Sequence, residues 1–174
     1  MSRAFAKEDD TGQPPIIPPR AALPPGTPNY VTPRGLELLR NELTELETEL
    51  SRATTNRDDD AERSRQLSIL NGRIAMLTER LGSAKLVDPR NQPADEVRFG
   101  ATVTLKTLKG AKPGLLRKFT IVGADEADIS KGLIAFVAPI ARAVQGAKTG
   151  QKITLQLGPT KEEAEVTEIH YGTT

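Results

Sequence analysis

Two leucine ladders constrain what this chain can fold into. Each ladder steps alternately by three and four residues, which is the spacing of the a and d positions of a coiled coil. The ladders are Leu36, Leu39, Leu43, Leu46, Leu50 and Ala53, followed by Leu67, Leu70, Ile74, Leu77, Leu81 and Ala84. Residues 54–66 between them hold no large apolar side chain. If the chain folds back there, every ladder residue meets a partner, so the sequence predicts an intramolecular antiparallel hairpin and a monomer.

A long parallel dimer of one continuous helix is the alternative. The polar run over residues 54–60 argues against it, because β-branched and short polar residues compete with the helix and favour caps and turns. Thr32 is a good N-cap and Pro33 suits the first helical position, so the first helix is predicted to run from there to about Ala53. The second helix is predicted to begin between residues 56 and 59, capped by Thr55 or Asn56.

Four carboxylates gather at the expected turn, in an acidic tip near residues 56–63. They are Asp58, Asp59, Asp60 and Glu62. One interpretation is structural, because carboxylates in the first turn of a helix complement its dipole by about 0.3–1 kcal/mol each. The other is functional, since these groups would project about 10 Å beyond the last ladder residues, at the point farthest from the rest of the protein.

Composition excludes several classes of function. The chain has no cysteine and a single histidine, His170, so thiolate metal sites and a histidine-based triad are unavailable. The net charge of +1 does not require a nucleic-acid or membrane partner. Only 3% of the residues are aromatic, which argues against a surface that stacks nucleic-acid bases. No apolar run approaches the roughly 20 residues of a membrane span, and residues 1–10 do not resemble a signal peptide, which suggests a cytoplasmic protein.

Residues 1–29 and residues after 88 have different character from the hairpin at 30–88. Seven prolines in the first segment predict a disordered or polyproline II tail, either simply solvated or a ligand for a proline-reading domain. Residues 89–96 are predicted to be a linker. Residues 97–172 show short apolar runs separated by glycine, lysine and proline turns, with one helix at about 139–145. The fold class is therefore α+β, a coiled-coil hairpin followed by a small antiparallel β domain.

Several strings of this sequence resemble the GreA/GreB family of bacterial transcript-cleavage factors. The resemblance spans most of residues 30–172: it begins at 31–43, resumes from 72 through 81 to 88, and is closest at 97–105, 121–128 and 138–143. The most specific strings are Gly123-Ala124-Asp125-Glu126-Ala127-Asp128 and Pro139-Ile140-Ala141-Arg142. The resemblance implies an FKBP-like β domain, and it brings associations with transcription regulation and DNA binding.

The resemblance also implies a mode of action. In this family the β domain holds the rim of the secondary channel of RNA polymerase, and the coiled coil enters the channel. The acidic tip helps to position a Mg²⁺ ion and water, and the polymerase hydrolyses the backtracked RNA. The factor would then be no enzyme by itself, would bind no cofactor alone, and would meet the nascent RNA 3′ end only indirectly.

The family's Asp-x-x-Glu spacing is matched by Asp59 and Glu62, which therefore inherit the catalytic and metal-holding roles, while Asp58 and Asp60 are supplementary. Polymerase binding is expected through exposed residues of the β domain. These are Asp125, Glu126, Asp128, Pro139 and Arg142.

Three departures keep other functions open. Asp58 and Arg63 replace the family's glycine and asparagine beside the motif, and the tyrosine that usually follows is missing. Each arm of the hairpin is about one heptad, or about 10 Å, shorter than in the family. A secondary-channel regulator that binds or inhibits without cleavage is therefore the main alternative. A coiled-coil module unrelated to polymerase and a prolyl isomerase are weaker ones, because fold alone does not fix function.

Overall fold

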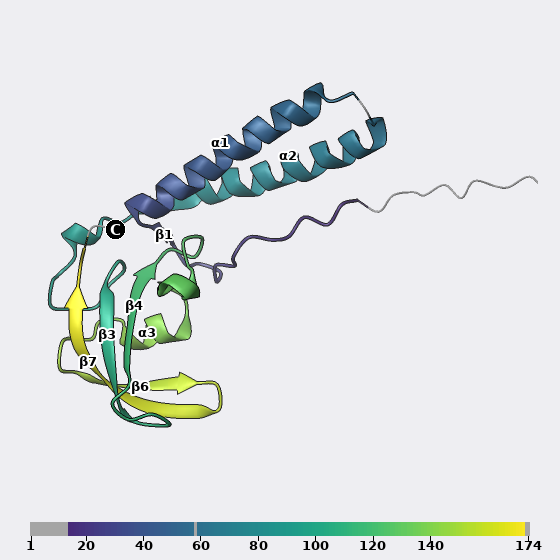
Figure 1. The fold of residues 1–174 in the computed structure, drawn as a ribbon. Helices are drawn as coiled ribbons and strands as arrows, with labels where there is room; N and C mark the ends of the chain where they lie inside the picture. Colours follow the sequence, from purple (N-terminus) through teal and green to yellow (C-terminus); the bar gives the residue numbers. More distant parts are fainter. Residues whose placement is uncertain (1–13, 58, 173–174) are drawn as a thin grey trace, which may run out of the picture.

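The hairpin is present and antiparallel. The structure, a computed structural model, describes residues 14–57 and 59–172. Helix α1 (Pro33–Thr55) and helix α2 (Asp60–Ser83) lie side by side and project together from the rest of the molecule (Figure 1). Thr32 caps α1 as expected, because its Oγ1 accepts a hydrogen bond of 2.9 Å from the Gly35 N–H.

The start of α2 differs from the prediction. Asp59, rather than Thr55 or Asn56, is the N-cap, since its Oδ1 accepts the N–H groups of Ala61 and Glu62 at 2.9 and 3.1 Å. Asn56 instead ends α1, where its N–H donates to the Arg52 carbonyl. The turn lies within residues 54–66, as the ladders predicted, but α2 begins at Asp60, one residue after the predicted interval.

The coiled-coil seam is confirmed. All the predicted ladder residues belong to one apolar cluster, together with Val31. Leu39, Leu46 and Leu77 are its most deeply buried leucines. Removing these side chains from water stabilises the hairpin by roughly 1.5–3 kcal/mol for each fully buried leucine.

The β domain is built on a five-stranded sheet in the order β5-β4-β3-β7-β6. The strands are β3 (Thr102–Lys109), β4 (Leu116–Val122), β5 (Leu133–Ala135), β6 (Lys152–Leu157) and β7 (Thr160–His170). Helix α3 (Pro139–Val144) lies where a helix was predicted, and its buried Ala141 and Val144 join the core of the sheet. The α+β class is confirmed, while the FKBP-like subtype stays a prediction.

One strand pair departs from the expected antiparallel arrangement. β5 pairs with β4 in parallel, with Thr120 opposite Leu133. Between them, the loop over residues 123–132 contains the 3₁₀ turn η2 (Ile129–Lys131) and carries the chain back before β5 begins. The other three strand pairs of this sheet are antiparallel.

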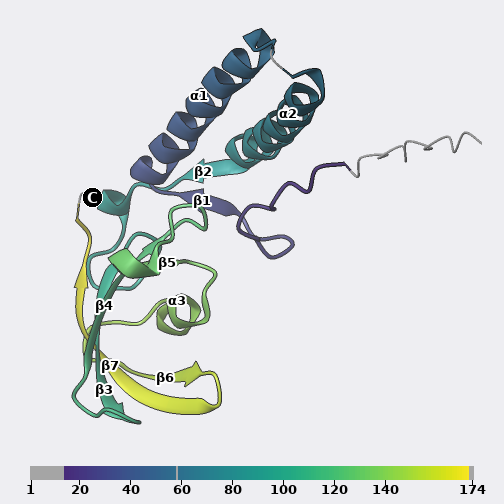
Figure 2. The same ribbon diagram turned by 45° about the vertical axis from the view of Figure 1, so that its right-hand side comes forward.

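A second, two-stranded sheet closes the base of the hairpin and was not foreseen. β1 (Asn29–Val31) and β2 (Ala84–Leu86) pair in parallel, and Figure 2 shows them side by side below the helices. The Asn29 side chain donates to the Arg80 carbonyl and to Ser83 Oγ at 2.9 and 3.2 Å. After β2, the 3₁₀ turn η1 (Pro89–Asn91) occupies the start of the expected linker.

The base of the hairpin packs directly on the β domain. The Tyr30 ring lies 5.7 Å from the Phe99 ring and 5.5 Å from the Phe136 ring, measured between centroids. A Cβ at Gly123 would lie 2.7 Å from the Tyr30 carbonyl oxygen, so this close backbone approach requires glycine. Aromatic contact and backbone proximity together hold the two parts against each other.

The described part of the proline-rich segment differs from a solvated tail. Residues 14–28 run beside the hairpin (Figure 1), and the Arg20 side chain forms ion pairs with both the hairpin and the β domain. Residues 1–13, to which the prediction of disorder also applied, lie outside the described residues. Within the described ranges, no helix has the length and apolar character needed to cross a bilayer.

Candidate functional site

The acidic tip is exposed, and its carboxylates have local partners. Asp59 and Glu62 occupy the N-cap and third positions of α2, so both lie on its first turn. Glu62 Oε1 accepts a 3.3 Å hydrogen bond from Gln66 and lies 4.0 Å from Arg65 Nη1. These are weak contacts at an exposed site, so they leave the carboxylates available to an incoming ligand.

Asp60 differs from Glu62 because its ion pair with a basic side chain is close. Its Oδ1 lies 2.6 Å from Arg63 Nη2, while Arg63 Nη1 donates to the Asn56 carbonyl. Arg63 therefore fastens the first turn of α2 to the end of α1. Asp58, the other supplementary residue of the prediction, lies outside the described residues.

The spacing of Asp59 and Glu62 has a structural meaning as well as a chemical one. N-cap and third-position residues are the two positions of a capping box, and carboxylates there face the positive end of the helix dipole. The cap holds Asp59 in one orientation through two main-chain donors. Within residues 14–57 and 59–172, which include Asp59, Asp60 and Glu62 of the tip, no three acidic or histidine side chains form a group that could hold a metal ion.

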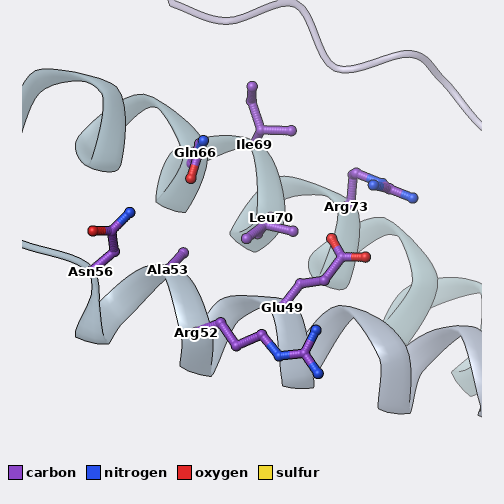
Figure 3. Close-up of a pocket in the computed structure, with 8 residues that line it drawn as sticks. All are labelled: Glu49, Arg52, Ala53, Asn56, Gln66, Ile69, Leu70 and Arg73. Atoms are coloured by element: carbon purple, nitrogen blue, oxygen red, sulfur yellow. The ribbon is translucent and has the colours of Figure 1, made fainter. Parts of the chain in front are cut away.

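A shallow hollow of about 440 Å³ lies beside the tip, between the two helices. Figure 3 shows Ala53 and Leu70 facing each other, with charged and amide side chains around them. Its lining residues are Glu49, Arg52, Ala53, Asn56, Gln66, Ile69, Leu70 and Arg73. Because Ala53 is the smallest residue of the first ladder, the seam is least filled here, just before the exposed turn.

Asp125 was expected to be exposed for docking, and this expectation is wrong. Its side chain is only 8% exposed and lies at the junction of the hairpin and the β domain. Oδ1 lies 3.0 Å from Arg20 Nη2, and Oδ2 lies 3.3 Å from Arg80 Nε. Two arginines from different segments thus enclose one carboxylate, which is how a buried charge is retained in a fold.

Glu126 is also buried rather than exposed. Its Oε2 accepts a 2.5 Å hydrogen bond from the hydroxyl of Thr32, the N-cap of α1. A Cβ at Gly35 would lie 2.8 Å from the same oxygen, so glycine in the first turn makes room for the carboxylate. Glu126 therefore attaches the start of α1 to the β domain.

Three residues of the predicted docking set are accessible. Pro139 and Arg142 are exposed on α3. Asp128 is 39% exposed, and the Ser130 hydroxyl, hydrogen-bonded to Oδ1 at 2.5 Å, is the main cause that lowers the pKa of this carboxyl. Next to it, Ile129 is 85% exposed, an apolar side chain on the same turn that sequence reasoning did not single out. Its signal was an isoleucine set between polar turn residues.

The basic residues of the junction were not predicted from the sequence. Arg20 and Arg80 are 105 and 45 positions from Asp125, and neither belongs to a motif. Their side chains are 19% and 12% exposed, much less than is usual for surface arginines. The signal for Arg20 was indirect, an arginine within a proline-rich run, and Arg80 carried none.

Comparisons with known proteins agree on one family. The family described as "Transcription elongation factor, GreA/GreB, C-term" matches residues 92–171. Transcription elongation factor GreA of Ralstonia nicotianae is 35% identical over 156 residues, covering 81% of this chain and 96% of the relative. Transcription elongation factor GreB of Neisseria meningitidis serogroup A is 33% identical over 159 residues, covering 83% of this chain and 95% of the relative.

Among solved structures, the prokaryotic transcription elongation factor GreA/GreB from Nitrosomonas europaea covers 83% of this chain and 99% of its own. It is 18% identical, and its TM-score is 0.40, an overlap too low for an element-by-element comparison. The extent and identity of the sequence matches decide the assignment: the chain belongs to the GreA/GreB family of transcription elongation factors.

Proposed function

We propose that this Gre-type elongation factor binds RNA polymerase at its secondary channel in the cytoplasm and stimulates cleavage of backtracked transcripts. The observation that carries the proposal is the position of Asp59 and Glu62. Both are exposed, both lie on one helical turn, and that turn is the end of the hairpin farthest from the β domain (Figure 1). An arm of this kind delivers carboxylates into a narrow channel.

The chemistry suits a hydrolytic displacement at phosphorus. Mg²⁺ prefers oxygen ligands, and a bound ion activates water and offsets the charge of the displacement. Asp59 is held by two main-chain N–H groups and Glu62 follows three positions later, so both side chains can address one ion from the same face. The polymerase supplies the remaining ligands and carries out the hydrolysis, and the factor contributes these two.

The β domain provides the docking surface in this proposal. The accessible part of the predicted set is Asp128, Pro139 and Arg142, with Ile129 beside Asp128. Reversing the charge with Asp128→Lys is expected to weaken polymerase binding. The melting temperature should change little, because the bonds of Asp128 are local to its own turn. Unaltered binding would remove this turn from the interface.

The decisive experiment measures transcript cleavage in a stalled, backtracked elongation complex. Asp59→Asn with Glu62→Gln is the informative variant, because asparagine caps a helix as well as aspartate does while lacking the charge. We expect retained fold and polymerase binding, with cleavage stimulation lowered by about 10–100-fold or more. Asp60→Asn and Asp58→Asn serve as matched controls and should have milder effects. Wild-type cleavage by the double variant would reduce the tip to a helix cap.

One observation favours the alternative, a regulator that occupies the channel without promoting cleavage. The alignment with the Ralstonia relative has 156 positions but covers 81% of 174 residues, about 141, so about fifteen positions have no residue of this chain. That number matches two heptads, which is the total shortening that the sequence predicts for the two arms. α1 has 23 residues, so the arm is about 35 Å long. A wild-type protein that only slows synthesis, at every Mg²⁺ concentration, would establish this alternative.

A further inference from the structure

Arg20 joins three segments that are distant in sequence. Its Nη1 and Nη2 bond to the two carboxylate oxygens of Glu42 on α1 at 2.7 and 2.9 Å. Its Nε bonds to Asp125 Oδ1, in the loop after β4, at 3.1 Å. The two-pronged contact with a carboxylate is one that arginine makes and lysine cannot reproduce. One side chain of the proline-rich segment therefore bridges the hairpin and the β domain.

The second helix enters the same network. Arg80 of α2 pairs with Asp125 through Nε, and its Nη2 donates to the carbonyl of Ala21, the residue after Arg20. Asp125, Arg80 and Arg20 are all at least four-fifths buried as side chains. Partly buried, hydrogen-bonded ion pairs resist screening by salt better than surface pairs do. The network thus holds α1, α2, the β domain and the proline-rich segment at one point.

A second contact lies on α2 between Arg80 and the tip. Gly72 is in the interior of that helix, where glycine costs roughly 1 kcal/mol relative to alanine. A Cβ at Gly72 would overlap the Cδ1 atom of Ile17, so the glycine makes room for this isoleucine. The cost to the helix has a packing reason, and that reason lies in the proline-rich segment.

The segment is loosely packed around these anchors. A cleft of about 580 Å³ is bordered by Pro18, Pro19 and Arg73 among others. Another, of about 350 Å³, is bordered by Leu23, Met76 and Glu79 among others. The attachment therefore depends on Ile17 and on the Arg20 network more than on continuous apolar burial.

We propose that residues 17–28 form a strap that fixes the direction of the hairpin relative to the β domain, with Arg20 as its main positioning residue. The consequence for activity rests on the function proposed above. The tip lies at the end of an arm of about 35 Å, so a rotation of about 10° at its base displaces the tip by about 6 Å. A strap at the junction therefore controls where Asp59 and Glu62 arrive.

The first test measures the spread of interdomain distances in the free protein. The chain has no cysteine, so spin labels at Glu47→Cys on α1 and Thr149→Cys in the β domain report a single distance. Arg20→Ala leaves the junction to the remaining contacts, among them those of Tyr30, Gly123 and Glu126, so the distance distribution should broaden, by about twofold. Arg20→Lys should lie between the wild type and Arg20→Ala. Arg40→Ala, at an exposed arginine of α1, is the control and should keep the wild-type width.

The double variant Ile17→Ala with Arg20→Ala removes both anchors and should broaden the distribution most. Wild-type widths in both the single and the double variant would overturn the strap. A second experiment measures transcript cleavage. Arg20→Ala should lower the stimulation of cleavage while polymerase binding through the β domain persists. Full stimulation of cleavage by this variant would overturn the positioning role of Arg20. If the wild type stimulates no cleavage, the function proposed above fails, while the distance widths still decide whether the strap exists.

Discussion

Two groups of acidic residues lie at opposite ends of the hairpin, and their partners differ in kind. At the tip, Asp59 binds main-chain groups two and three positions away, and Asp60 pairs with a residue three positions away. At the base, Asp125 and Glu126 bond to residues 105 and 94 positions away. The tip carboxylates bond to neighbours within their own helical turn, whereas the base is where segments distant in sequence converge.

This difference separates carboxylates that the fold requires from carboxylates that it leaves accessible, without any knowledge of a ligand. A carboxylate that pairs with two arginines at a junction is needed for the fold, and its removal leaves positive charge buried without its partner. A carboxylate at an exposed helix start contributes little to folding and remains accessible. The same residue types should therefore respond to substitution through stability at the base and through activity at the tip.

The largest expected effect on stability is at Asp125. Asp125→Asn leaves Arg80 without its counter-charge and weakens one contact of Arg20, so it should lower the free energy of unfolding by about 3 kcal/mol. Urea denaturation measures the change. Asp60→Asn, which breaks an exposed pair at the tip, is the matched control and should cost under about 0.5 kcal/mol. Equal effects would abolish the distinction between the two ends.

Gly123 tests the backbone contact at the base. A Cβ there would lie 2.7 Å from the Tyr30 carbonyl oxygen, so Gly123→Ala should force β1 away from the β domain and cost about 2 kcal/mol. Gly82→Ala is the control, because nothing lies within 4 Å of its Cβ position and it sits within α2. That substitution should stabilise by up to about 1 kcal/mol. Thermal melting of both variants should show shifts of opposite sign.

How far the sequence predicted the fold depends on the range of each interaction. The coiled-coil seam followed from a period that repeats within a few residues, and every predicted ladder residue is in the cluster. β1 and β2 are three residues long, too short for any alternation to show. Alternation also fixes which face of a strand is buried but not the direction of its neighbour, so the parallel pairing of β5 was missed.

The placement of the acidic residues was predictable at the tip and not at the base. The Asp-x-x-Glu spacing is a local pattern, and the structure keeps Asp59 and Glu62 on one turn. The burial of Asp125 and Glu126 depends on Arg20, Arg80 and Thr32, whose distance along the chain carries no periodic signal. Proline-rich composition correctly excluded regular structure near Arg20, but it gave no information on contacts.

Low pH should destabilise the contacts at the base of the hairpin, by less than the substitutions above. The hydrogen bonds from Arg20 are the main cause that lowers the pKa of Glu42 below its ordinary 4.5, with further help from the charges of Arg20 and Arg73. The folded chain therefore holds this proton less tightly than the unfolded chain does. The stabilisation is complete above the ordinary pKa and is lost as the pH falls through the lower, folded value.

Because Glu42 is one-third exposed, the contribution should be under about 1 kcal/mol. Unfolding free energies of the wild type and Glu42→Gln, measured from pH 6 to pH 3, should converge at the acid end. A constant difference across this range would mean that the charge of Glu42 does not act through Arg20.

The smallest expected change in stability is at Asp59, and it bears most directly on the tip. Asp59→Asn keeps a side-chain oxygen that accepts the N–H groups of Ala61 and Glu62, and asparagine and aspartate are about equal as N-caps. The free energy of unfolding should therefore stay within about 0.3 kcal/mol of wild type, while Asp59→Ala should lose about 1 kcal/mol with the cap. Chemical denaturation of the three proteins at low ionic strength distinguishes the effect of the cap hydrogen bonds from the effect of the charge.

If Asp59→Asn costs as much as Asp59→Ala, the interaction of the charge with the helix dipole dominates at this position, and the carboxylate is a structural group like those at the base. If only Asp59→Ala is destabilised, any loss of cleavage in Asp59→Asn reports on the chemistry of the carboxylate alone.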